Sequence, residues 1–253
     1  MRRAITGRFD GPKHVLVFGV GGLALAGLLF FGAYLFYPPD NGYVFLEKSA
    51  SYLGSFDQER NPQGWWLFSL GLFVIGIVST GATLFRHRML APVIEPRYPL
   101  FFASGAFLVG SALLFALGAV PDARTFYVGS FNLNDIHDKL AAGSFWCLGL
   151  GMLSDGLILR GNRSDHGSTR ILHKHIAKPY IAFAVVGVIG GGSLLIWHIQ
   201  CRLDSSLKEW PGHGIYSFPM WEWILTFAGP LTLVAVAWQL ARYPPREAGM
   251  KTE

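Results

Sequence analysis

The stretch GWWLFSLGLFVIGIVSTGATLF, residues 64–85, contains no charged side chain. An α-helix needs about 20 apolar residues to cross the hydrocarbon core of a bilayer, so this stretch predicts a transmembrane helix. Five further runs of the same kind lie on either side of it. They cover about 14–37, 99–120, 139–159, 179–199 and 219–241. The sequence therefore predicts an all-α bundle of six transmembrane helices that forms a single domain over residues 1–253.

The composition agrees with this class of protein. Hydrophobic residues make up 51% of the chain and charged residues 15%, whereas soluble domains carry roughly 25% charged residues. The net charge of +5 follows from basic residues spread over several loops. A nucleic-acid site would need a clustered basic face, so nucleic acid is not an expected partner. The expected partners are membrane lipids.

The Lys and Arg residues of the loops predict the orientation. Segments 1–13, 86–98, 160–178 and 242–253 hold four, three, five and three of them, and segments 38–63, 121–138 and 200–218 hold two, one and two. Basic loops stay on the cytoplasmic side. Both termini are therefore expected inside, in a plasma (cytoplasmic) membrane, with the other three segments outside.

The expected outer side carries polar residues at the edge of the membrane, where they are costly and often functional. His137 opens the fourth span and follows Asp135, and Glu222 opens the sixth span between two tryptophans. Because His137 and Glu222 lie at the same depth, we expect a hydrogen bond between them, directly or through one water. The alternatives are an interfacial histidine with its tip in water and acidic residues that only favour helix N-termini.

A serine in the first outer segment adds to this group. Ser51 lies in the segment Ser49–Gly54, which Asn61 and Pro62 follow. Ser, Gly, Asn and Pro are also common in turns, so the segment has a purely structural interpretation as well. The candidate catalytic residues are thus His137, Glu222, Ser51 and Asp135, with no role assigned.

The sequence contains little that indicates a metal or cofactor site. The sequence contains no phosphate loop, no His-Glu-x-x-His and no Cys-x-x-Cys, and we expect no cofactor. A zinc site could be assembled only from residues whose spacing does not enforce one: His137, Asp135, His198, His213 and Glu222.

One acidic residue lies near the expected inner end of the fourth span. Asp155 is interpreted as half of a structural ion pair with Arg160 or Arg163 rather than as a transport carboxylate. On this interpretation, Asp155→Asn should be mild.

A resemblance to a known family rests on these outer residues. The pattern Ser51-x-x-Gly54 followed by Pro62, the single His137 and the pair Glu222-Trp223 resemble the Frag/DRAM/Sfk family of six-helix membrane proteins. The stretch Val120–Asp122 also resembles a related uncharacterised bacterial and archaeal membrane-domain family. The resemblance implies involvement with membrane lipids and carries no agreed catalytic mechanism.

Three functional hypotheses follow. The first is a protein that binds, senses or helps redistribute lipid at the outer leaflet. The second is a membrane-embedded lipid hydrolase or acyl transferase in which His137 is the general base, oriented by Asp135 or Glu222, and Ser51 is the nucleophile. The third is a structural subunit whose partner is a second copy or another membrane protein. An enzyme needs Ser51 or a metal within hydrogen-bond reach of His137, and a lipid binder does not.

Overall fold

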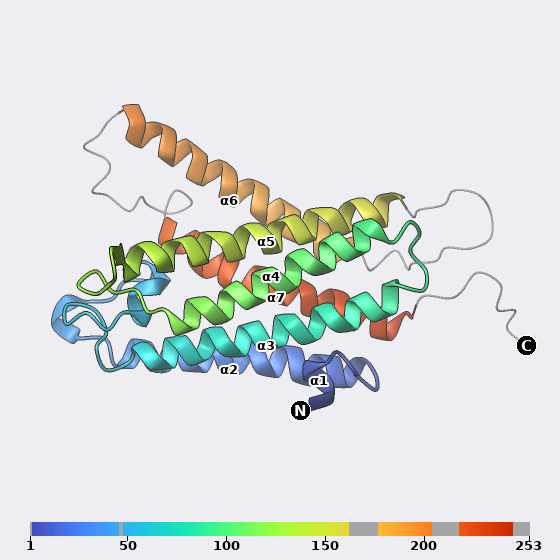
Figure 1. The fold of residues 1–253 in the computed structure, drawn as a ribbon, viewed down its shortest axis with the longest axis horizontal. Coiled ribbons are helices and arrows are strands. Elements are labelled where there is room, and N and C mark those ends of the chain that lie inside the picture. Colours follow the sequence, from blue (N-terminus) through green and yellow to red (C-terminus); the bar gives the residue numbers. More distant parts are fainter. Residues whose placement is uncertain (1, 46–47, 162–176, 204–217, 245–253) are drawn as a thin grey trace, which may run out of the picture.

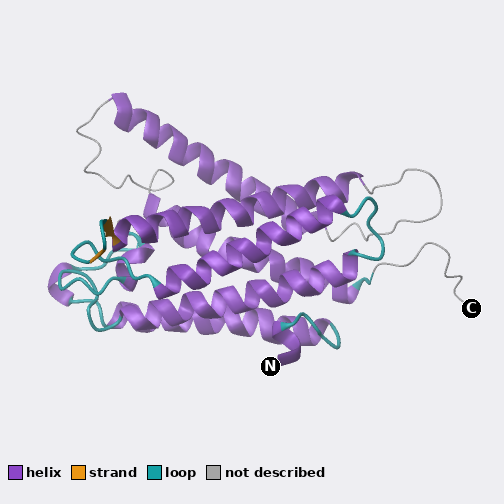
Figure 2. Ribbon diagram, viewed as in Figure 1, coloured by secondary structure: helices purple, strands orange, loops and turns teal. Residues whose placement is uncertain are grey.

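The computed structural model describes residues 2–45, 48–161, 177–203 and 218–244, and within them the chain is helical apart from loops and one short hairpin (Figure 2). The elements are α1 (Arg2–Ile5), α2 (Pro12–Leu35), the 3₁₀ helices η1 (Pro39–Asn41) and η2 (Ala50–Gly54), α3 (Trp65–Leu90), α4 (Tyr98–Ala119), β1 (Tyr127–Val128), β2 (Phe131–Asn132), α5 (Leu133–Gly161), α6 (Ala177–Leu203) and α7 (Phe218–Arg242).

Five of these helices are long and apolar enough to cross a membrane, which indicates an integral membrane protein. They are α2, α3, α4, α5 over Leu133–Ile158, and α7 over Pro219–Arg242. The sixth expected span lies within α6, whose apolar described part is the shorter stretch Lys178–Gly187. The expectation of an all-α protein is therefore confirmed, and the six spans with both termini inside stay a prediction.

The five helices that are apolar enough to cross a membrane lie side by side (Figure 1). Helix α3 packs against α2, α4 and α7, while α5 covers the other side of α4. Helix α6 packs on α5 and α7, and its C-terminal end leans away from α5 (Figure 1).

Glycines allow some of the closest helix contacts, as expected from their number. Gly76 faces the ring of Phe115, and a Cβ at Gly190 would lie 2.6 Å from the ring of Trp221. It is Gly190 that lets α6 approach α7.

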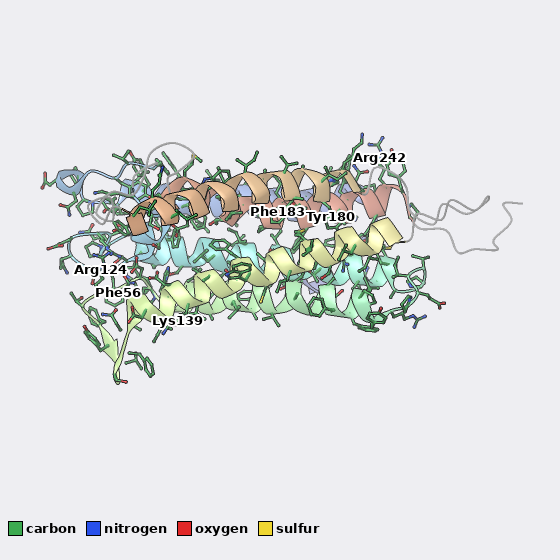
Figure 3. The ribbon with its side chains drawn as sticks, turned by 90° about the horizontal axis from the view of Figure 1, so that it is seen from above. Phe56, Arg124, Lys139, Tyr180, Phe183 and Arg242 are labelled. Atoms are coloured by element: carbon green, nitrogen blue, oxygen red, sulfur yellow. The ribbon has the colours of Figure 1, made fainter. Side chains whose placement is uncertain are left out.

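The bundle has two distinct ends. The hairpin end carries η1, η2 and the β1–β2 hairpin, whose tight turn uses Gly129 at φ 63°. The terminal end carries α1, the loop 91–97 and the last turn of α7. Figure 3 shows Phe56, Arg124 and Lys139 at the hairpin end and Arg242 at the terminal end. The candidate residues His137, Ser51 and Glu222 all belong to the hairpin end.

Candidate functional site

The carboxylate of Glu222 joins α7 to the 3₁₀ helix η2. Its Oε2 accepts hydrogen bonds from the Ser49 hydroxyl and from the Ala50 N–H at 2.9 Å, and its Oε1 accepts one from the Ser51 N–H at 3.3 Å. The first N–H groups of a helix have no partner within the helix. Glu222 therefore satisfies these groups from a distant part of the chain.

A second hydroxyl extends this contact. The Ser51 hydroxyl donates to the Ser49 Oγ at 3.1 Å, so a chain of hydrogen bonds leads from Ser51 through Ser49 to Glu222. Ser51 is buried, with 7% of its surface exposed, and Ser49 is partly buried. The serine that touches the carboxylate is thus Ser49, which the sequence motif passed over in favour of Ser51.

His137 lies near the start of α5, is only 2% exposed, and faces the end of α4. Its Nδ1 lies 2.7 Å from the carbonyl oxygen of Val120. A carbonyl can only accept, so Nδ1 carries a proton and donates it; in the neutral tautomer with that proton, Nε2 is an acceptor. In the described part of the chain, Nε2 has no hydrogen-bond partner.

The expected direct hydrogen bond between His137 and Glu222 is therefore absent from the described residues. Glu222 binds the segment Ser49–Ser51, and His137 binds the end of α4 through Val120. Asp135 does not orient the histidine either, because it is exposed in the first turn of α5. Ser51 likewise donates to Ser49 rather than to His137.

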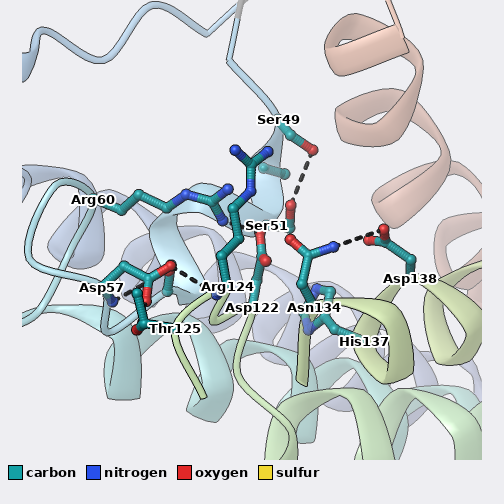
Figure 4. Close-up of polar contacts among 12 residues, drawn as sticks. Ser49, Ser51, Asp57, Arg60, Asp122, Arg124, Thr125, Asn134, His137 and Asp138 are labelled. Atoms are coloured by element: carbon teal, nitrogen blue, oxygen red, sulfur yellow. Dashed lines mark hydrogen bonds and ion pairs between the residues drawn. The ribbon is translucent and has the colours of Figure 1, made fainter. Parts of the chain in front are cut away.

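A buried ion pair lies beside these residues (Figure 4). Arg60 donates to Asp122, and their side chains are 7% and 3% exposed. The Arg60 guanidinium also lies over the Tyr52 ring, 3.9 Å from its centroid. One further nitrogen of Arg60 and one oxygen of Asp122 are buried without a hydrogen bond. The pair ties the loop after η2 to the loop after α4.

Asp57 makes a second tie between the same two loops (Figure 4). It accepts the Arg124 N–H at 2.9 Å and the Thr125 hydroxyl at 2.7 Å. Burial pushes the pKa of Asp57 upward, but these hydrogen bonds and the charge of Arg60 outweigh burial, and the pKa falls below its ordinary value. Asp57 is therefore held as an anion.

Asn61 fixes the path of the loop between η2 and α3. Its amide donates to the carbonyls of Ala33 at 2.9 Å and Leu53 at 2.8 Å, and its side-chain oxygen accepts the Gly64 N–H at 3.1 Å. The residue is completely buried. Asn61 thus connects the last turn of α2, the end of η2 and the start of α3, and the simple turn interpretation holds for this residue.

Aromatic rings line one side of the site. Tyr43 and Phe45 pack on each other, Phe45 packs on Trp223, and the Trp223 indole N–H donates to the Tyr43 oxygen at 3.2 Å. Burial raises the pKa of Tyr43, although the Trp223 bond opposes it, so this phenol stays protonated. Its hydroxyl lies 3.0 Å from the Ser49 carbonyl oxygen, which joins the rings to the segment that holds Glu222.

A metal site does not emerge from the described residues. Among them, no group of three or more His, Cys, Asp or Glu side chains is arranged to hold a metal ion. The candidates His137, Asp135 and Glu222 do not form such a group by themselves. His213 and the side chain of His198 lie outside the described residues.

Asp155 has a partner that the sequence analysis did not name. It forms an ion pair with Arg86 of α3, and it accepts a hydrogen bond from the Tyr180 hydroxyl of α6. Arg86 also donates to Ser104 of α4 at 2.9 Å. The predicted ion pair is confirmed, but its partner is Arg86, which had been placed in a loop. The side chains of Arg160 and Arg163 lie outside the described residues.

Comparison with known proteins adds no further identification. No family model, no curated protein and no solved structure matches this chain. The resemblance to the Frag/DRAM/Sfk family therefore stands on its sequence motif.

Proposed function

We propose that this protein binds the polar headgroup of a lipid at the hairpin end of the bundle and so senses or helps redistribute lipid in the outer leaflet. The observation that carries the proposal is the position of Glu222. Its carboxylate and two serine hydroxyls gather at the start of a transmembrane helix, beside aromatic rings. Lipid headgroups and esters lie at this depth, and Trp and Tyr favour it.

The free hydrogen-bonding capacity of the site favours a headgroup that donates hydrogen bonds. His137 Nε2 has no partner among the described residues, and one oxygen of Asp122 is buried without one. A buried acceptor such as this Asp122 oxygen costs free energy unless a donor reaches it. A lipid hydroxyl or ammonium group is such a donor. On this proposal the hairpin end faces outward, in a plasma membrane.

Lipids retained by the purified protein test the proposal. They should be identified by mass spectrometry beside those of His137→Ala and Glu222→Gln. Hydrogen bonds to charged groups are worth about 1.5–3 kcal/mol, so Glu222→Gln should lower retention of the specific lipid by about tenfold or more. Ser144→Ala is the matched control, because among the described residues this hydroxyl bonds only to the Ala141 carbonyl of its own helix. Retention that is equal in all four proteins would refute the proposal.

The second candidate function is a lipid hydrolase or acyl transferase, and the Ser49–Glu222 hydrogen bond favours it. The Ser49 oxygen would attack an acyl carbonyl while Glu222 takes the hydroxyl proton; the ester bond would then break as Glu222 gives that proton to the departing lipid alcohol, and water or a second alcohol would release the acyl group from Ser49. The N–H groups of Ala50 and Ser51 are already bound to Glu222, which leaves no oxyanion donors there. A fluorophosphonate probe that labels the wild type and Ser51→Ala but not Ser49→Ala would support the enzyme; absence of labelling would refute it.

A further inference from the structure

A pocket of about 590 Å³ lies at the terminal end, far along the bundle from the site described above. Its walls come from the loop before α4, the first turns of α4 and the last turns of α5. The lining residues are Ile94, Glu95, Pro96, Tyr98, Pro99, Phe102, Ser154, Leu157 and Ile158. Its volume falls in the range of small-molecule sites, roughly 300–1,000 Å³.

The pocket faces the outside of the bundle at the edge of the membrane. Phe102 and Leu157 are 58% and 62% exposed, and both lie in helices that are apolar enough to cross a bilayer. Glu95 precedes α4 and is exposed. Since a helix rises 1.5 Å per residue, the pocket runs from the polar boundary to about 6 Å below it between Tyr98 and Phe102.

The lining therefore combines an apolar floor with a polar mouth. Grooves that face the lipid are filled by hydrocarbon chains. The apolar floor formed by Phe102, Leu157 and Ile158 therefore fits an acyl chain. Tyr98 stands at the mouth, where a phenol can donate to an ester carbonyl. A wholly apolar occupant would leave the mouth unused.

The charges at the mouth indicate the kind of headgroup. Glu95 lines the mouth, is exposed and forms no ion pair within the described residues. An exposed carboxylate at the mouth complements a headgroup that carries an ammonium group. We propose that this pocket binds one phospholipid with a primary-amine headgroup, such as phosphatidylethanolamine, from the leaflet at the terminal end.

Native mass spectrometry of the purified full-length chain tests the site, with phosphatidylethanolamine and phosphatidylglycerol added at equal concentration. The wild type should retain phosphatidylethanolamine preferentially. Leu157→Trp should remove this bound lipid because the larger ring fills the pocket. Leu150→Trp is the matched control, since Leu150 is exposed on the same helix but does not line the pocket.

The headgroup preference is tested separately. Glu95→Gln should lower the ratio of phosphatidylethanolamine to phosphatidylglycerol by about two- to fivefold, the size expected for an exposed ion pair. Glu59→Gln, an exposed carboxylate at the hairpin end, should leave the ratio unchanged. The proposal is overturned if Leu157→Trp retains as much lipid as Leu150→Trp, or if the wild type has no headgroup preference. Neither result bears on Glu222 at the opposite end.

Discussion

Replacing Asp155 by Asn should strongly destabilise this protein, contrary to the mild effect that its sequence position predicts. The side chains of Arg86 and Asp155 are 0% and 1% exposed, so neither charge can turn to solvent. Figure 3 shows Tyr180, the third member of the cluster, on the part of α6 that lies along the bundle. The substitution leaves Arg86 buried with no counter-charge.

The size of the effect follows from this burial. Removing one partner of a buried ion pair costs about 3–5 kcal/mol, and Asn retains an oxygen that can accept from Arg86, so we expect about 3 kcal/mol. Tyr180→Phe removes one hydrogen bond to a charged group and should cost about 1.5–3 kcal/mol. Total stabilities are often only about 5–15 kcal/mol, so either change should be measurable.

A double-mutant cycle separates the ion pair from general damage to the core. Arg86→Met and Asp155→Leu should each cost about 3–5 kcal/mol. The double variant buries no lone charge and should lose only about 2 kcal/mol, because Ser104 and Tyr180 then lack partners at about 1 kcal/mol each. The two sites should therefore couple by at least about 4 kcal/mol.

The assay is equilibrium unfolding in mixed detergent micelles, followed by tryptophan fluorescence. Ser154→Ala serves as the control, since within the described part of the chain this neighbouring hydroxyl bonds only to the Leu150 carbonyl of its own helix. The reasoning is refuted if Asp155→Asn unfolds at the same midpoint as the wild type. It is also refuted if the free-energy losses of Arg86→Met and Asp155→Leu simply add in the double variant.

Three further predictions concern the hairpin end. The folded-state pKa of Asp57 is lowered from its ordinary 3.8, so the stability that its carboxylate contributes should be full above pH about 4 and lost as the pH falls through the lower folded value. Asp57→Asn should flatten this part of the curve of unfolding free energy against pH. A curve equal to that of the wild type would contradict the lowered pKa. Asn61→Ala should cost about 1–3 kcal/mol in detergent unfolding because two buried carbonyls and one N–H lose their partner, and a wild-type midpoint would rule this out. In a chain whose two native cysteines are replaced by Ser, a membrane-impermeant maleimide added to intact cells should label Tyr127→Cys but not Arg97→Cys, both at exposed positions; the reverse pattern would invert the proposed orientation.

The helices could be predicted because their signal is local. The runs about 99–120 and 219–241 agree closely with α4 at Tyr98–Ala119 and α7 at Phe218–Arg242. Where an apolar run ends in charge, the same method fails. The expected span 64–85 stopped before Arg86, yet α3 continues to Leu90 because Asp155, 69 positions away, receives that charge. Likewise α5 begins at Leu133, before the apolar run, so His137 is already inside the helix.

The candidate site was found only in part, for a related reason. Hydropathy and motif patterns depend on side chains, and they drew attention to Glu222 and to the segment around Ser51, which the structure joins by hydrogen bonds. The groups that bind Glu222 include two backbone N–H groups, which every residue but proline possesses and no motif can mark. Which serine meets the carboxylate depends on where η2 begins, since a start two residues later would present the Ser51 hydroxyl instead of that of Ser49. The choice between Ser49 and Ser51 is therefore made by a helix start and by a partner more than 170 positions away.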